Sequence, residues 1–163
     1  MSKASVKQDI IAGCSRFDLL LPEQVAYVLA TVDHETAGTF EPVRECFYLG
    51  KSAEGARQRL KYYPYYGRGY VQITHKANYQ KFGMLLGLNL VGNPDLALDH
   101  ETALFILLRG FKDGLFTGKK LQDYINRHRT DFIGARRCIN GQDRAASIAT
   151  LARSYQKELR GAE

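Results

Sequence analysis

The chain has 163 residues, of which 45% are hydrophobic and 25% are charged, and this balance excludes a disordered or fibrous protein. Its net charge of +6 favours a polyanionic partner such as nucleic acid, anionic lipid or an acidic cell wall. No apolar run approaches the roughly 18 residues of a membrane-spanning helix, and the Met-Ser-Lys start lacks the apolar centre of a signal peptide. We therefore expect a single domain over residues 1–163 that is synthesised in the cytoplasm.

The spacing of apolar residues, with Gly or Pro between the segments, predicts a mostly helical chain. The expected helices are residues 4–14, 22–36, 75–87, 95–112, 120–138 and 142–160. The region from Gly38 to Thr74 is instead rich in Tyr, Phe, Gly and Pro, which indicates a small hairpin or irregular lobe. The predicted fold class is α+β, mostly α-helical, with one inserted β-like lobe.

The helix expected at 22–36 begins with Pro22 and ends in Asp-His-Glu-Thr-Ala, before Gly38 as a favourable C-terminal stop. Glu35 would then lie at the negative end of the helix dipole, where the protonated carboxylic acid is favoured. Glu35 is therefore a candidate proton donor.

The same pentapeptide returns at residues 99–103, where it is expected to begin a helix. Asp99 is a suitable N-cap and Glu101 would fall in the first turn, where a charged carboxylate is stabilised. We assign Glu101 a helix-starting role. Neither copy has the second histidine of the zinc-protease pattern, so no metal site is predicted from them.

A carboxylic acid that cleaves a glycosidic bond needs a second carboxylate within reach. Glu41, Glu45 and Glu54 follow Glu35 in the lobe. In an extended chain Glu41 and Glu45 share a face, so their spacing leaves the choice between them open. The alternative is that these glutamates are solvated surface charges.

Residues 65–79 combine two glycines, an arginine and four tyrosines with amide and hydroxyl side chains, a composition typical of a sugar-binding wall. The run 70–74 alternates, so an extended chain would place Val71 and Ile73 on one face and the polar side chains, with Tyr70, on the other. The alternative is an ordinary half-buried strand with a polar outer face.

The segment from residue 119 to 163 contains ten Lys or Arg against five Asp or Glu, so it contributes +5 of the net charge. Its helix at 142–160 could contact an anionic outer membrane through basic side chains. The alternative is a helix that packs one face on the core. Basic residues do not interleave with the tyrosines, which argues against a nucleic-acid-binding domain.

The three cysteines are Cys14, Cys46 and Cys138, an odd number at no metal-like spacing. This pattern supports neither a disulfide framework nor a zinc site. We interpret them as small apolar packing residues.

Four separated motifs together resemble the catalytic domain of glycoside hydrolase family 19, in the short form found in bacteriophage endolysins. They are His34-Glu35-Thr36, then Phe40 to Glu45, then Tyr66-Gly67-Arg68-Gly69 with Gln72 to His75 and Asn78-Tyr79, and finally Ile139-Asn140-Gly141. The resemblance implies a lysozyme-like or chitinase-like two-lobed domain, with a small β-hairpin lobe beside the catalytic cleft.

The resemblance also implies the roles of individual residues. Glu35 would be the general acid, Glu45 the general base, and Thr74 would help to hold the attacking water. The implied substrate-binding residues are Gln72, Asn78, Asn140, His34, Tyr66 and Arg68. The family inverts the anomeric carbon, which requires carboxyl groups about 6.5 to 9.5 Å apart.

Some positions depart from the family pattern. Tyr70 stands where plant enzymes often have proline, Ala77 replaces an aromatic residue, and the chain has no Trp. Sugar binding is therefore expected to rely more on hydrogen bonds than on stacking. The loop after Asn140 is short, which weakens the supporting role that Arg144 would have near the acid.

From these residues we predict an endolysin that hydrolyses glycosidic bonds of peptidoglycan glycan strands, with a chitinase acting on N-acetylglucosamine polymers as the alternative. We expect a monomer with no cofactor, no metal, no nucleic-acid partner and no separate cell-wall-binding domain. Such an enzyme would be made in the host cytoplasm and act on the cell wall in the periplasm.

Overall fold

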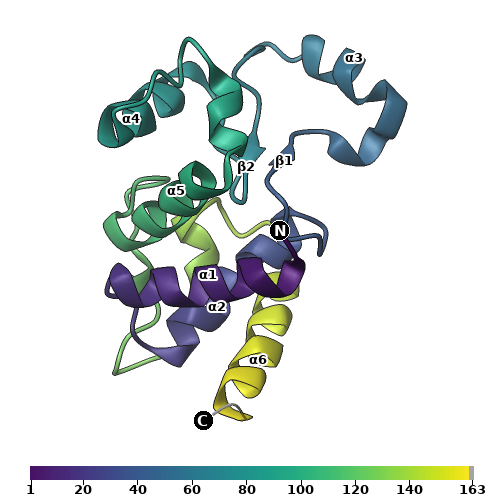
Figure 1. The fold of residues 1–163 in the computed structure, drawn as a ribbon. Coiled ribbons are helices and arrows are strands. Elements are labelled where there is room, and N and C mark those ends of the chain that lie inside the picture. Colours follow the sequence, from purple (N-terminus) through teal and green to yellow (C-terminus); the bar gives the residue numbers. More distant parts are fainter. Residues whose placement is uncertain (162–163) are drawn as a thin grey trace. The chain divides into compact units, whose positions relative to one another are not determined.

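The computed structural model describes residues 1–161, which form two compact units (Figure 1). The helical unit contains residues 1–40 together with the chain from Leu107 onward. The tyrosine-rich unit contains residues 41–106. The sequence-based expectation of an α+β, mostly α-helical chain with a small amount of sheet is confirmed.

The helical unit is built around helix α2. Its elements are α1 (Lys3–Arg16), α2 (Pro22–Glu35), the end of α5 (His100–Asp113), the short 3-10 helices η3 (Leu121–Asp123) and η4 (Gly134–Cys138), and α6 (Ala145–Gly161). Helix α2 packs against both α1 and α6, the yellow C-terminal helix of Figure 1. At its centre the buried ring of Tyr27 stacks on Phe132 and meets Phe111 edge-on, which fixes three segments around one aromatic core.

Both ends of α2 follow from local chemistry. Pro22 occupies the first turn, and the side chain of Gln24 accepts a hydrogen bond from the Leu21 N–H. At the other end Gly38 has a φ of +80°, and its N–H donates to the carbonyl of Asp33 at 2.8 Å. The expected helix at 22–36 is therefore confirmed, and it ends at Glu35.

Helix α6 buries one face and exposes the other. Ala145, Ile148, Ala149, Ala152 and Tyr155 are buried, and the helix contacts α2. Packing of this helix on the core, one of the two alternatives from the sequence, is therefore confirmed. Its exposed face carries Arg153 and Lys157, and contact with an anionic membrane stays a prediction.

The helix predicted at 120–138 is wrong. Only η3 and η4 are helical there, and Ile125 and Thr130 form an isolated antiparallel bridge between them. The side chain of Asn126 accepts hydrogen bonds from the N–H groups of His128 and Arg129, which turns the chain. Short polar side chains compete in this way with the helical backbone hydrogen bonds.

The tyrosine-rich unit contains less strand and more helix than its composition predicts. Its elements are β1 (Val43–Arg44), η1 (Phe47–Ser52), α3 (Ala53–Gln58), β2 (Arg68–Gly69), α4 (Lys76–Leu86), η2 (Pro94–Leu98) and the start of α5. The two strands pair antiparallel, Val43 with Gly69 and Arg44 with Arg68. Because η1 and α3 lie between them in the chain, β1 and β2 are not joined by a tight turn.

The single helix predicted at 95–112 is interrupted at Asp99, which has an extended backbone between η2 and α5. The Asp99 carboxylate accepts hydrogen bonds from the N–H and the hydroxyl of Thr102, each at 3.2 Å. Asp99 therefore caps α5, and Glu101 lies in the first turn as expected.

The predicted alternation over residues 70–74 holds only in part. Val71 and Ile73 are buried, but Tyr70 is also buried, with 1% of its surface exposed. Its hydroxyl lies 2.6 Å from Nδ1 of His100. Arg68 and Ile73 pair across a tight turn in which Gly69 has a φ of +112°, so the segment is a turn and not an extended strand.

Two further sequence expectations concern cysteines and membranes. Cys14 and Cys138 are buried, and burial raises the pKa of each thiol to about 12, which fits packing residues. Cys46 is partly exposed, and all three are free thiols. Within residues 1–161, no helix combines the length and the apolarity that crossing a membrane requires.

Candidate active site

Glu35 is the last residue of α2, and a buried arginine holds its carboxylate. Nη1 of Arg136 lies 3.3 Å from Oε1 of Glu35, and 4% of the Arg136 side chain is exposed. Nε of the same guanidinium donates to the carbonyl of Asp143 at 2.8 Å. Arg136 belongs to η4, so a residue of η4 orients the carboxyl group of Glu35, and both residues lie in the helical unit.

Sequence reasoning missed Arg136. It assigned the supporting role to Arg144, which is exposed and has a φ of +61°. The omission follows from the wrong helix at 120–138, since Arg136 would have been one of several cationic side chains along it. The available signal was the run Gly134 to Cys138, where arginines stand among small and apolar residues.

His34 and Asn140 belong to the same unit as Glu35. Nδ1 of His34 lies 3.9 Å from Oε1 of Glu35, and this buried nitrogen has no hydrogen-bond partner among the residues that the structure describes. Asn140 is exposed, and its Oδ1 accepts the N–H of Gly141 at 2.9 Å. His34 therefore lies beside the predicted acid, whereas Asn140 offers its amide nitrogen on an exposed loop.

Glu45 is held at both carboxylate oxygens. The hydroxyl of Tyr62 donates to Oε1 at 2.6 Å, and the N–H of Gly67 donates to Oε2 at 2.8 Å. The backbone is fixed as well, because the Glu45 N–H donates to the Gly67 carbonyl and Nε of Arg57 donates to the Glu45 carbonyl, both at 2.7 Å. These contacts at both oxygens and at the main chain hold the Glu45 carboxylate in one orientation, and its role as general base stays a prediction.

The other two candidate carboxylates of the lobe have different surroundings. Glu54 forms an ion pair with Arg57 at 3.2 Å and its side chain is 53% exposed. Glu41 is exposed at the start of the unit. Glu41 and Glu54 are thus exposed whereas Glu45 is partly buried, and the choice of Glu45 as the base stays a prediction.

Three polar side chains predicted to act on water or sugar lie near one another in the sequence and in the same unit as Glu45. Nδ2 of Asn78 donates to the Thr74 carbonyl at 2.7 Å, which joins the start of α4 to the preceding segment. Nε2 of Gln72 donates to the Val43 carbonyl at 3.1 Å. A Cβ at Gly67 would clash with the Gln72 side chain, which explains why glycine occupies this position.

Tyr66 and Arg68 are buried and hydrogen-bonded. Arg68 is 4% exposed, and it donates to Asp95 at 2.9 Å and to the Pro64 carbonyl at 2.8 Å. Its guanidinium lies 3.8 Å from the centre of the Tyr66 ring, which is itself buried. Arg68 is therefore paired with a carboxylate inside the lobe, and the burial of Arg68 and Tyr66 is consistent with a supporting role for both residues.

Asp95 joins two arginines of the lobe. Arg44 contacts it at 2.8 Å and Arg68 at 2.9 Å. The hydrogen bond from Arg44 lowers the pKa of the Asp95 carboxyl, burial opposes this effect, and the hydrogen bond from Arg68 lowers it further. The result is an ion-pair network that fixes β1 and β2 to η2.

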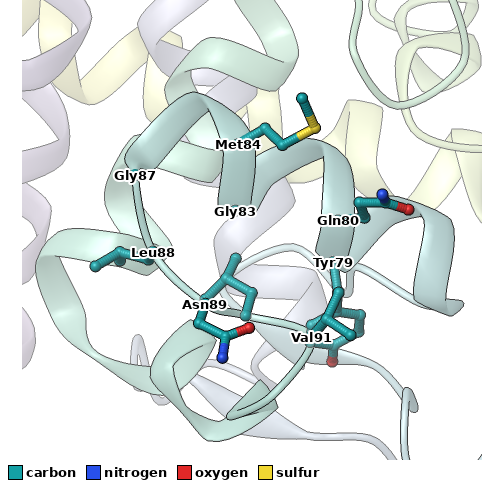
Figure 2. Close-up of a pocket in the computed structure, with 9 residues that line it drawn as sticks. Tyr79, Gln80, Gly83, Met84, Gly87, Leu88, Asn89 and Val91 are labelled. Carbon is teal, nitrogen blue, oxygen red and sulfur yellow. The ribbon is translucent and has the colours of Figure 1, made fainter.

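A pocket of about 190 Å³ lies elsewhere in the tyrosine-rich unit, between α4 and the segment that follows it (Figure 2). Its lining is Tyr79, Gln80, Gly83, Met84, Gly87, Leu88, Asn89, Leu90 and Val91. These described lining residues include no carboxylate and no histidine, and Tyr79 alone among them belongs to the segment 65–79 that was expected to bind sugar. The pocket is therefore not an alternative site for the hydrolysis.

The predicted site residues fall into two groups. Glu35, His34 and Asn140 belong to the helical unit, whereas Glu45, Thr74 and the remaining sugar-binding candidates belong to the tyrosine-rich unit. Residues 1–161 contain no group of three His, Cys, Asp or Glu side chains that could hold a metal ion. The carboxyl groups of Glu35 and Glu45 are of the type that can transfer protons in acid and base catalysis.

Comparison with known proteins identifies the family. The model of glycoside hydrolase family 19, described as chitinase class I, matches residues 22–108, somewhat more than half of the chain. Similar proteins include Chitinase 8 of Oryza sativa subsp. japonica, 39% identical over 47% of this chain and 30% of that protein. Acidic endochitinase Q of Nicotiana tabacum is 34% identical over 57% of this chain and 36% of that protein.

The matched region includes Glu35, Glu45 and the whole segment 65–79. The chain spans about a third of the length of these two relatives. A short stretch is more similar still, since Chitinase 11 of Oryza sativa subsp. japonica is 57% identical over 42 residues. The chain belongs to glycoside hydrolase family 19, the family of the class I chitinases.

Proposed function

We propose that the chain is a glycoside hydrolase that cleaves polymers of N-acetylglucosamine, with Glu35 as the general acid and Glu45 as the general base. The observation that carries this proposal is the family match, which covers both carboxylates. The similar plant proteins are named as chitinases and endochitinases, which supports chitin as the substrate.

The proposed reaction is a single displacement with inversion at the anomeric carbon. Glu35 gives its proton to the glycosidic oxygen as the bond from that oxygen to the anomeric carbon breaks. Water forms the new bond to the same carbon from the opposite face, and Glu45 accepts the proton that this water releases. Acid or base catalysis of this kind contributes about 10² to 10⁴ in rate for each group.

Thr74 and the amide side chains would position the reactants. Thr74 is half-buried and would hold the attacking water, whereas Gln72, Asn78 and Asn140 would donate hydrogen bonds to the sugar. Gln72 and Asn78 already donate to backbone carbonyls within the lobe, which fixes where their side chains lie. Since the chain has no Trp, these hydrogen bonds would provide much of the substrate specificity.

Peptidoglycan glycan strands are the second candidate substrate, as the endolysin hypothesis requires. The observation that favours them is the basic character of the chain, with its net charge of +6, which suits an anionic cell envelope. The matches to plant chitinases favour chitin and give the endolysin hypothesis no support.

Parallel digestion separates the two substrates. Chitin hexamers and purified peptidoglycan would each be incubated with the chain and with a variant that carries both Glu35→Gln and Glu45→Gln. The products would be identified by mass spectrometry of their reducing-end sugars. We expect the unchanged chain to shorten the chitin hexamer and the double variant to leave it intact. Cleavage of peptidoglycan alone would replace the chitinase proposal with the endolysin, and cleavage of neither would refute the hydrolase.

A further inference from the structure

The Tyr62 side chain is fixed on three sides. It belongs to the turn after α3, where the Tyr65 N–H donates to the Tyr62 carbonyl at 2.8 Å. Its ring meets the imidazole of His75 edge-on, with 4.9 Å between the ring centres. Its hydroxyl donates to Oε1 of Glu45 at 2.6 Å. A phenol held by backbone, ring and hydroxyl together can fix the direction of the group that it contacts.

Glu45 has four lone-pair directions on its two oxygens, and two of them are occupied. Tyr62 occupies one on Oε1, and the Gly67 N–H occupies one on Oε2. The remaining directions are the ones from which the carboxylate can accept a proton. The Gly67 donor is a backbone N–H, which a side-chain substitution does not remove. Of the two donors, only the Tyr62 hydroxyl can therefore be removed by changing a side chain.

We propose that Tyr62 is a positioning residue, whose hydroxyl holds the Glu45 carboxylate so that a free lone pair faces the attacking water. This inference rests on the proposed function of Glu45 as the general base. Without the hydroxyl, the carboxylate would rotate about its last side-chain bonds, and fewer of its orientations would meet the water. The effect is expected on the chemical step and not on sugar binding.

The phenol of Tyr62 is protonated at neutral pH. Burial raises the pKa of Tyr62 to about 12, and the hydrogen bond to Glu45 adds to the effect. Tyr62 therefore donates to Glu45 and does not compete with it as a base. Arg57 complements this contact by holding the Glu45 backbone carbonyl, so the main chain and the side chain of Glu45 are fixed by different residues.

Tyr62→Phe removes only the hydroxyl and tests the proposal kinetically. Loss of a hydrogen bond to a charged group is expected to lower kcat for chitin hexamer roughly 10- to 100-fold, with KM unchanged. The matched control is Tyr155→Phe, because the Tyr155 hydroxyl donates to the Asp33 carboxylate at the same distance of 2.6 Å in the helical unit. The control is expected to keep the kcat of the unchanged chain.

Two kinetic outcomes would overturn the proposal. One is a Tyr62→Phe variant with unchanged kcat. The other is an equal loss of kcat in both tyrosine variants, which would show that any lost tyrosine–carboxylate bond weakens the fold enough to slow the reaction.

A second measurement is independent of activity. With ¹³C at the ring carbon that bears the hydroxyl, the NMR signal of Tyr62 should shift as acid protonates Glu45, and this shift should vanish in Glu45→Gln. Tyr155 is the internal control, since its signal should still respond to Asp33 in that variant. A Tyr62 signal that titrates identically with and without the Glu45 carboxylate would refute the contact. If the unchanged chain cleaves no glycan, the proposed function fails, and the NMR titration still decides whether Tyr62 holds Glu45.

Discussion

The guanidinium of Arg136 lies 3.3 Å from the carboxylate of Glu35, and the two residues are 101 positions apart in the chain. Arg136 also donates to the carbonyl of Asp143, so one side chain links the end of α2 to the segment that precedes α6. A buried guanidinium of this kind has two consequences, one for stability and one for the direction in which Glu35 points.

Arg136→Met should lower the free energy of unfolding by about 1–3 kcal/mol, since it leaves a partly buried carboxylate and a backbone carbonyl without their donor. Arg144→Met is the matched control, because Arg144 is exposed. Thermal unfolding followed by circular dichroism would compare the two variants. Equal unfolding temperatures would show that the contact contributes nothing to the fold.

Glu35→Gln should lower kcat for chitin hexamer roughly 10²- to 10⁴-fold, because the amide cannot protonate the glycosidic oxygen. The control is Glu101→Gln, which makes the same change within the same pentapeptide at a side chain that is 81% exposed. We expect Glu101→Gln to retain full activity. Rates would be measured by chromatography of the released oligomers, and a slow Glu101→Gln variant would contradict the assignment of roles to the two copies.

Glu45→Gln and Glu41→Gln decide which carboxylate is the base. Glu45→Gln should remove most of the activity and leave the fold intact, since a glutamine can still accept hydrogen bonds at its carbonyl oxygen. Glu41→Gln should remain active. The measurement is the same hexamer assay, with circular dichroism to verify folding, and an inactive Glu41→Gln beside an active Glu45→Gln would reverse the assignment.

Asp95→Asn should destabilise the chain near neutral pH and have a smaller effect in acid. Because the folded pKa of Asp95 is lowered, its contribution is complete above the unfolded value of about 3.9 and is lost as the pH falls through the lower folded value. The unfolding temperatures of the two proteins should therefore converge below about pH 4. A constant difference from pH 7 to pH 2 would show that the Asp95 charge is not involved.

The predictable parts of the fold were those with local signals. Pro22 and Gly38 mark the ends of α2, and Asp99 marks the start of α5. The prediction of a helix over residues 120–138 was wrong, because the turns there depend on the side chains of Asn126 and Asp131, which accept hydrogen bonds from nearby backbone N–H groups. The spacing of apolar residues carries no information about such side-chain hydrogen bonds, which compete with those of the helical backbone.

Site residues that lie within a family motif could be predicted from the sequence. Contacts between residues that are far apart in the chain could not. Glu35 and Glu45 follow from the family resemblance, and their roles as acid and base stay predictions. Arg136 and Tyr62 do not follow, because each reaches its carboxylate only after the chain folds. Tyr66 and Arg68 were interpreted as sugar contacts, although burial places them in the interior of the lobe.

The tyrosines are divided unequally between the two units. Residues 41–106 contain seven of the ten tyrosines, and Tyr27, Tyr124 and Tyr155 are in the helical unit. Since the chain has no Trp, its ultraviolet absorbance and fluorescence come mainly from these phenols, and most of that signal reports on one unit. Far-ultraviolet circular dichroism reports on helices in both. Comparing the two signals during denaturation therefore shows, without any label, whether the tyrosine-rich unit loses its structure before the helical unit does.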